Sequence, residues 1–204
     1  MKDFELILFD LGNTIFFIDF ELTFAHWANS SGLAVADVKR RYVFDEIHQQ
    51  FERGRIDEEE YVDYINAQFK IPLTQQQFFD GWNAIYLENL PGIEELLENL
   101  NKTHRVAALS NTNETHEAVW KHKYKDLFLN FEKVYASHDL DAIKPEPIIY
   151  QKVIDDTGVP ANKILFLDDK EENIVGAKAV GMEGIVVSSP EAMYSGLKRL
   201  GIEF

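Results

Sequence analysis

Residues 6–13 read Leu6-Ile7-Leu8-Phe9-Asp10-Leu11-Gly12-Asn13, an apolar run that ends at once in turn-forming residues. A run of this length with this ending predicts a β-strand. Because it is apolar at every position rather than at alternate positions, both faces of the strand should be buried, as is typical of a parallel sheet. The sequence therefore predicts that this strand lies inside a parallel sheet.

Similar apolar runs occur later in the chain, and helical patterns lie between them. Strands are expected at 106–109, 133–136, 164–167 and 185–187. Helices are expected at 93–100, 147–157, 173–180 and from 190 onward. The last helix has Ser189 as its N-cap and Pro190 in its first position. From about residue 89, the alternation of strand and helix predicts a doubly wound α/β fold.

The segment 16–88 differs from the rest, since after Ile18 it contains no further strand-like run. Helices are expected at 20–30, 36–51, 57–69 and 75–88. The aromatic residues expected in their shared core are Trp27, Phe44, Phe78, Phe79 and Trp82. We therefore expect an all-α domain at 16–88, inserted into an α/β core domain made of 1–15 and 89–204.

The composition argues against several classes of protein. The 204 residues include 20 Lys plus Arg and 35 Asp plus Glu, a net charge of −15 that argues against binding nucleic acid. There are no cysteines, which excludes disulfides and thiolate metal sites. No apolar run is long enough to span a membrane, and Met1–Glu5 lacks the pattern of a signal peptide. We expect a soluble, cytoplasmic protein with no nucleic-acid or membrane partner; its oligomeric state is not predicted.

Polar residues follow three of the predicted strands directly. They are Asp10, Ser110 and the pair Asp168-Asp169. Each of them alone is consistent with a simple turn or helix cap. In open α/β sheets, however, ligands bind outside the carboxyl ends of the strands, where these residues would meet. Together they predict a binding or catalytic site.

Four motifs in this order resemble those of the haloacid dehalogenase (HAD) superfamily of phosphohydrolases. They are Asp10–Thr14, Ser110-Asn111, Lys144-Pro145 and Asp168-Asp169 with Asn173. The helical insertion resembles the family's cap domain, so the resemblance covers nearly the whole chain. It implies a Rossmann-like parallel-sheet core with an inserted α-helical cap. The turn 51–54 and residues 110–113 resemble a subgroup that includes α-D-glucose-1-phosphate phosphatases.

The resemblance implies that Asp10 is the nucleophile and forms an aspartyl-phosphate, which water then hydrolyses. Ser110, Asn111 and Lys144 would bind the phosphoryl oxygens and stabilise their charge during transfer. The resemblance thus implies phosphatase activity on a small phosphorylated metabolite. A sugar phosphate, such as a hexose 1-phosphate, is the favoured substrate.

The resemblance also implies a Mg²⁺ cofactor. Asp10, the Gly12 carbonyl and Asp169 would ligate the ion, while Asp168 would hold Lys144 or a metal-bound water. Asn173 would orient the acidic loop. Mg²⁺ prefers such hard oxygen ligands, and together with Lys144 it would balance the charge of the three carboxylates.

Residues of the predicted cap would contact the leaving group. His48, Glu52 and Arg53 are the candidates, because they lie next to a turn closed by Gly54. His116 and His122 are expected to have structural or surface roles, since no His cluster with zinc spacing is present.

One position departs from the family pattern. The usual acid/base Asp, two residues after the nucleophile, is replaced by Gly12. Three alternatives therefore stay open: a 2-haloacid dehalogenase, which needs no metal; a phosphomutase, which needs the missing acid; and a non-catalytic phosphate-binding or regulatory protein. The paired Asp168 and Asp169 argue against the first, and Gly12 argues against the second.

Overall fold

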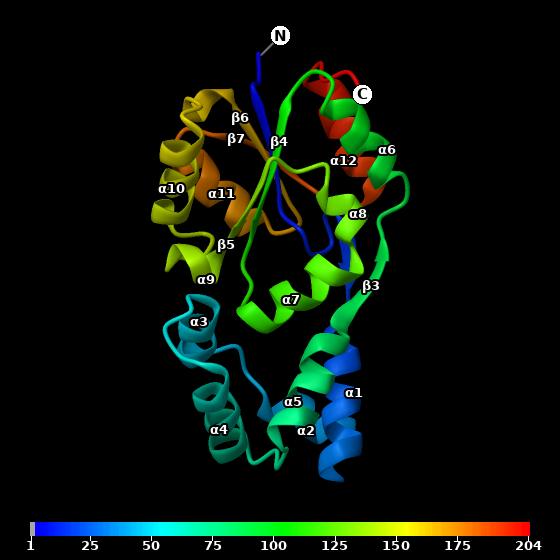
Figure 1. Ribbon diagram of the computed structural model, residues 1–204, viewed down its shortest axis with the longest axis vertical. Coiled ribbons are helices and arrows are strands. Elements are labelled where there is room, and N and C mark those ends of the chain that lie inside the picture. The colour runs from blue at the N-terminus through cyan, green and yellow to red at the C-terminus, as the bar shows by residue number, and fades with distance from the viewer. Residues whose placement is uncertain (1–2) are drawn as a thin grey trace.

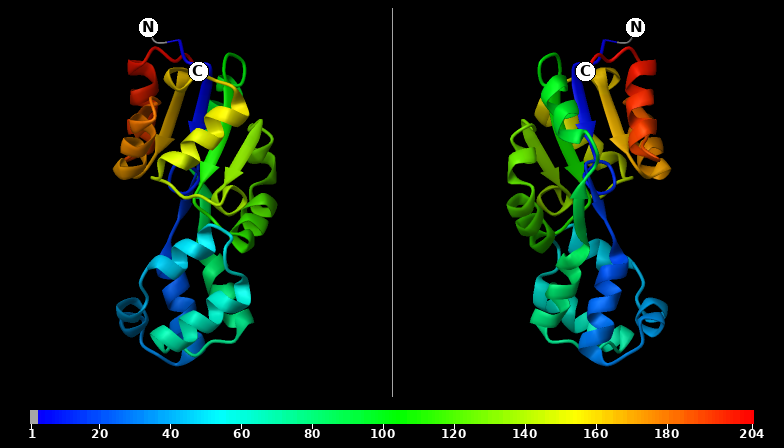
Figure 2. Two further views of the ribbon diagram at one scale, coloured as in Figure 1. Left: turned by 90° about the vertical axis from the view of Figure 1, so that its left-hand side faces the viewer. Right: turned by 90° about the vertical axis from the view of Figure 1, so that its right-hand side faces the viewer.

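The computed structural model describes residues 3–204 and has two lobes connected by two neighbouring chain segments (Figures 1 and 2). Met1 and Lys2, part of the N-terminal stretch analysed above, lie outside the described residues. Within 3–204, none of the helices combines the length and the apolar character that a membrane crossing needs.

The large lobe contains the predicted parallel sheet, with the strand order β5-β4-β1-β6-β7. Its strands are β1 (Leu6–Phe9), β4 (Arg105–Ser110), β5 (Lys133–Ala136), β6 (Ile164–Asp168) and β7 (Glu183–Val186). β1 lies in the centre and pairs with β4 and β6 along its whole length. The continuous apolar pattern thus predicted the buried strands correctly, although β7 begins two residues earlier than expected.

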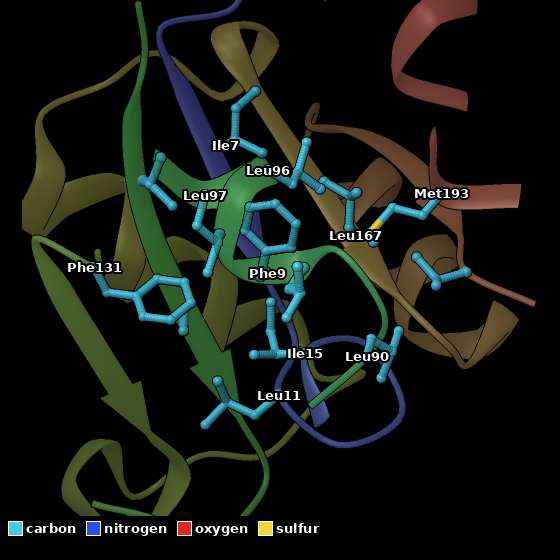
Figure 3. Close-up of a cluster of buried hydrophobic side chains, with 14 of the residues drawn as sticks. Ile7, Phe9, Leu11, Ile15, Leu90, Leu96, Leu97, Phe131, Leu167 and Met193 are labelled. Carbon is cyan, nitrogen blue, oxygen red and sulfur yellow. The ribbon is translucent and has the colours of Figure 1, made fainter. Parts of the chain in front are cut away.

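Helices cover both faces of this sheet, and the residues of β1 alternate between them. Leu6 and Leu8 pack under α10 and α11, while Ile7 and Phe9 pack under α6, α7 and α12 (Figure 3). The helices of this lobe are α6 (Ile93–Leu100), α7 (Glu114–Lys123), α8 (Lys125–Phe128), α9 (Ser137–Leu140), α10 (Pro147–Thr157), η2 (Ala161–Lys163), α11 (Glu171–Ala179) and α12 (Pro190–Arg199). This three-layer arrangement confirms the α/β fold class.

The small lobe is mostly helical, as expected, and it also contains two short strands that were not expected. Its elements are β2 (Phe16–Ile18), α1 (Phe20–Ser31), α2 (Val35–Arg41), α3 (Glu46–Glu52), α4 (Glu58–Phe69), α5 (Gln75–Trp82), η1 (Asn83–Ile85) and β3 (Tyr86–Asn89). β2 and β3 form an antiparallel ribbon between the lobes. The helix expected at 75–88 therefore ends at Trp82, because pairing with β2 overrides the helical propensity of 86–88.

The single helix expected at 36–51 is two helices. Tyr42 turns inward with only 6% of its surface exposed. The Asp45 carboxylate then accepts hydrogen bonds from the backbone N–H groups of Ile47 and His48 and starts α3. A carboxylate in this position caps a new helix rather than continuing the old one.

The core of the small lobe is a cluster of stacked aromatic rings. Trp27, Phe78 and Trp82 are fully buried in it, as expected. Phe44 was expected there too, and this was wrong. It is 49% exposed, because it lies in the break between α2 and α3 and lines a cavity instead.

Candidate active site

A cavity of about 690 Å³ lies between the lobes, at the carboxyl ends of β1, β4 and β6. The large lobe contributes Asp10, Ser110, Lys144 and Asp169 to its lining, and the small lobe contributes His48, Glu52 and Phe44. Three loops that are distant in sequence therefore meet here, as the strand-end pattern predicted.

The Lys144 ammonium is the centre of the site. Its Nζ lies 2.5 Å from an Asp10 oxygen, 2.8 Å from an Asp168 oxygen and 3.0 Å from the Leu109 carbonyl. Lys144 is 4% exposed and Asp168 is fully buried. A buried charge is stable only when it is paired and hydrogen-bonded, and here all three donors of the ammonium have acceptors.

The Asn111 side chain holds the Lys144 backbone in place. Its amide nitrogen donates to the Lys144 carbonyl at 3.0 Å, and its amide oxygen accepts from the Lys144 N–H at 2.8 Å. Since both polar atoms of this side chain are engaged, Asn111 fixes the loop that carries the lysine. Ser110, like Asp10, lines the cavity.

Asp10, Asp168 and Asp169 each place an oxygen within 4.8 Å of the other two. Asn173 donates its amide to both oxygens of Asp168 at 3.0 Å. Asn13 donates to Asp169 at 3.4 Å. These bonds orient the carboxylates toward a common point.

The electrostatics of this cluster favour a cation. Burial raises the pKa of Asp10 to about 7; the Lys144 charge opposes this rise, and the Asp168 charge adds to it. Burial and the neighbouring Asp168 also raise the pKa of Asp169. Burial alone would lower the pKa of Lys144, but Asp10 and Asp168 outweigh it and raise that pKa. With three carboxylates and one ammonium, two negative charges are left over, which a divalent ion with oxygen ligands such as Mg²⁺ would balance.

Gly12 lies beside Asp10, and a side chain there would meet Ile18. A Cβ at Gly12 would stand 2.8 Å from the Ile18 Cδ1, the far end of a flexible side chain. Gly12 does not have the left-handed backbone that favours glycine, whereas its neighbour Asn13 does, with a φ of 55°. The space for a side chain at residue 12 is therefore limited by the end of the Ile18 side chain, and not by the backbone conformation of Gly12.

Of the three predicted cap residues, two line the cavity and one does not. His48 and Glu52 line the cavity. Arg53 is not among the lining residues, because its two guanidinium nitrogens bind the Glu146 carboxylate at 2.6 and 2.5 Å. It therefore connects the two lobes instead of facing the cavity.

Sequence reasoning missed several residues that surround the cavity. Lys170 and Glu172 line it, and so does Glu146, the partner of Arg53. Their positions within the motif at 168–173 and directly after the motif at 144–145 were a usable signal. Two buried tyrosines of the small lobe, Tyr42 and Tyr61, connect to His48 through hydrogen bonds. Nothing in the sequence distinguishes them from other core aromatics.

The two histidines expected to have structural or surface roles, His116 and His122, differ in burial. His116 is buried, and its Nε2 donates to the Trp82 carbonyl at 2.9 Å. Burial lowers the pKa of His116 to about 4. His122 is exposed on α7. His116 thus joins α7 of the large lobe to the last turn of α5.

Comparison with known proteins gives consistent results. The family model of the haloacid dehalogenase-like hydrolases matches residues 4–181. A D-ribitol-5-phosphate phosphatase of Bacteroides thetaiotaomicron is 29% identical over 87% of this chain and 88% of its own length.

Two solved structures are also similar. A HAD family enzyme of Bacteroides thetaiotaomicron, in complex with magnesium and inorganic phosphate, has a TM-score of 0.76 and 27% identity over 89% of this chain and 92% of its own. A HAD-like family hydrolase of Porphyromonas gingivalis has a TM-score of 0.83 and 25% identity, covering 99% and 100% of the two chains.

Proposed function

We propose that this chain, which belongs to the haloacid dehalogenase-like hydrolases, is a Mg²⁺-dependent phosphatase acting on a small phosphorylated sugar or sugar alcohol. The observation that carries the proposal is the Lys144 ammonium bound between Asp10 and Asp168, with Asp169 beside them. This set pairs a nucleophilic carboxylate with the positive charge that a phosphate needs to approach it.

Asp10 attacks phosphorus, and the bond to the leaving oxygen breaks as the aspartyl-phosphate forms. Lys144 offsets the charge of the incoming phosphate. The Ser110 hydroxyl and the backbone N–H of Asn111 donate to its oxygens, whose charge they stabilise during transfer. Water then hydrolyses the aspartyl-phosphate and regenerates Asp10.

Asp10, Asp169 and the Gly12 carbonyl would hold Mg²⁺, which when bound neutralises charge on the transferring phosphoryl group. Asp168 keeps Lys144 in place, and Asn173 fixes Asp168. Because residue 12 is a glycine, the proton for the leaving oxygen comes from water or from the cap.

Two substrates are favoured. The similarity to a D-ribitol-5-phosphate phosphatase supports a sugar alcohol phosphate. The resemblance of residues 51–54 and 110–113 to the α-D-glucose-1-phosphate phosphatase subgroup, which stays a prediction, supports a hexose 1-phosphate. A cavity of about 690 Å³ is large enough for either.

The test is phosphate release from ribitol 5-phosphate, glucose 1-phosphate and p-nitrophenyl phosphate, with Mg²⁺ or with EDTA. Asp10→Asn should lower turnover at least about 10³-fold, as expected when a nucleophile is removed. Asp63→Asn, an exposed carboxylate on α4, is the matched control. Halide release from 2-haloacids in EDTA would instead favour a dehalogenase, and no turnover of any phosphate would favour the non-catalytic alternative.

A second arm tests the metal site. Asp169→Ala should weaken Mg²⁺ binding more than Asp168→Ala, because Asp168 is already bonded to Lys144 and Asn173. Calorimetric titration with Mg²⁺ measures both. The opposite order would exchange the two roles.

A further inference from the structure

The wall of the cavity formed by the cap and its neighbours is acidic. Glu52 and Glu172 line it, as does Glu146, whose charge is balanced by Arg53. Among the described residues, the lysines and arginines that line the cavity are Lys144, already bound to Asp10 and Asp168, and Lys170. Arg53, which directly follows Glu52 in the sequence, is bound to Glu146 and does not line the cavity. A leaving group with a negative charge of its own would therefore meet more acids than bases.

Among the acids that line the cavity, Glu52 is held by a chain of hydrogen-bonded side chains. One of its oxygens lies 3.4 Å from the His48 Nε2. The other ring nitrogen of His48 is hydrogen-bonded to the Tyr61 hydroxyl at 2.8 Å, and Tyr61 is bonded in turn to the Tyr42 hydroxyl at 2.8 Å. The Glu52 backbone carbonyl accepts from the Ser137 hydroxyl of the large lobe at 2.6 Å.

This chain of polar groups crosses an aromatic core. Tyr61 is fully buried, and His48 is 5% exposed. Burying polar groups is unfavourable unless each is hydrogen-bonded, and apolar residues of similar size would fill the same space without that requirement. The chain ends at a carboxylate on the cavity wall, so its effect is to fix the position of Glu52.

The supports also keep Glu52 ionised. Burial alone would raise the pKa of Glu52, but the hydrogen bond and charge of His48, with a smaller contribution from Lys170, hold it below its usual value. An ionised carboxylate only accepts hydrogen bonds. It therefore binds hydroxyl groups and repels other carboxylates or phosphates. Phe44, whose ring contacts the His48 ring, also lines the cavity, is half exposed and offers an apolar surface.

We propose that Glu52, positioned by His48 and Tyr61, selects substrates whose leaving group is uncharged and rich in hydroxyl groups, and excludes those with a second anionic group. This inference rests on the proposed phosphatase function and adds to it a rule on charge: the leaving group of a good substrate carries no negative charge. Glu52 is the specificity-determining residue, and His48 and Tyr61 are positioning residues.

The test compares sorbitol 6-phosphate with 6-phosphogluconate, which differ only in a terminal CH₂OH or carboxylate. Wild-type protein should prefer sorbitol 6-phosphate in kcat/KM by about 100-fold, because like charges facing each other are strongly unfavourable. Glu52→Gln should narrow this preference by about tenfold, since the repulsion between carboxylates is lost. Glu59→Gln, an exposed acid on α4, removes the same charge away from the cavity and should leave the preference unchanged.

Tyr61→Phe tests the positioning role. It should raise KM for sorbitol 6-phosphate several-fold with little change in kcat. The reason is that only the hydrogen bonds between Glu52 and the hydroxyl groups of the substrate become less well aligned. Tyr135→Phe, which removes a hydroxyl bonded to Asp156 in the large lobe, is the control for a lost tyrosine hydroxyl. Equal KM values in wild type and Tyr61→Phe would overturn the positioning role.

The preference can also be measured without turnover. If neither compound is hydrolysed, the proposed phosphatase function fails for them, and the same pair is then titrated calorimetrically into wild-type protein with Mg²⁺. Tighter binding of sorbitol 6-phosphate would support the rule on charge. Equal or tighter binding of 6-phosphogluconate, or a Glu52→Gln effect no larger than that of Glu59→Gln, would overturn it.

Discussion

The two lobes bury polar groups in opposite ways. The large lobe buries charges, with Lys144 between Asp10 and Asp168 at the end of a sheet whose central strand, β1, is apolar at every position. The small lobe buries hydroxyl and imidazole groups: the hydroxyls of Tyr42 and Tyr61 and the ring of His48 lie in an aromatic core. Charge is needed where a phosphate must be held, whereas hydroxyl and imidazole groups are sufficient to orient a single carboxylate.

This contrast implies different sensitivities. Removing one member of a buried ion pair leaves an uncompensated charge, which is strongly destabilising. Removing one tyrosine hydroxyl from the hydrogen-bonded chain of the small lobe has a smaller effect on stability. We therefore expect substitutions in the large lobe to abolish activity and to alter folding, and those in the small lobe to change selectivity.

Lys144→Met should have the largest effect. It leaves Asp10 and Asp168 facing each other without a counter-charge, so unfolding in EDTA should become easier by about 3–5 kcal/mol, and turnover should fall at least about 10³-fold. Chemical denaturation and phosphate release measure the two effects. Lys133→Met, which breaks an exposed pair with Asp156, should change stability by less than about 1 kcal/mol. Similar losses in the two variants would remove the distinction between buried and exposed charge.

The next effect concerns Gly12. General acid catalysis is worth roughly 10²–10⁴-fold, and no carboxylate is available at this position to supply it. The transfer step should therefore depend steeply on the leaving group, with p-nitrophenyl phosphate and glucose 1-phosphate about 100-fold faster than glucose 6-phosphate. Single-turnover rates for a series of esters measure this dependence.

Gly12→Asp is the complementary variant for that series. The added side chain needs only the end of Ile18 to move, so the protein should fold, and the dependence on leaving-group basicity should become shallower. A flat series in wild-type protein would instead point to an acid in the cap, with His48 the first residue to replace.

His116 joins the two lobes and should make stability depend on pH. Its folded pKa of about 4 is below its unfolded value near 6.5, so in this range only the unfolded chain is protonated. Stability should therefore fall as the pH drops from 6.5 towards 4, by up to about 1.4 kcal/mol per pH unit from this residue. Denaturation curves of wild type and His116→Gln across this window isolate its share, and the exposed His122→Gln should behave like wild type.

The smallest effects are expected for the two ion pairs between the lobes, Arg53–Glu146 and Arg55–Asp141. Arg53→Met removes the bond to Glu146, which is 40% exposed in its side chain, and should change the free energy of unfolding by less than about 1 kcal/mol. Arg55→Met breaks the more exposed pair with Asp141 and should change it less. A loss above about 2 kcal/mol for Arg53→Met would mean that this pair behaves like a buried one.

The sequence predicted the large lobe better than the small one, for a physical reason. Strands buried on both faces are apolar at every position, so β1, β4 and β6 stand out locally. α4 was also predictable, since Asp57 and Glu60 form a capping box at its start. β3 was not, because it exists only through its pairing with β2, which is distant in sequence.

The candidate site divides in the same way. Asp10, Ser110 and Asp168 follow strands directly, so the topology alone brings them together. The reciprocal bonds between Asn111 and the Lys144 backbone depend on how two loops approach each other, and no local pattern encodes that approach. The role of the Tyr61 hydroxyl could not be predicted either, since a buried tyrosine is usually a packing residue.

The ribbon between the lobes also has a consequence for protein engineering. Phe16 and Asn89 are paired residues on β2 and β3, so the chain leaves the large lobe and returns to it one strand spacing apart. Closing an inserted segment between two points this close has an entropic cost that grows only slowly with the length of the segment. We therefore expect that a cap from another chain, or a short flexible linker, can be joined at these two residues, at the cost of the contacts that Trp82, Ile85 and Tyr86 make with the large lobe.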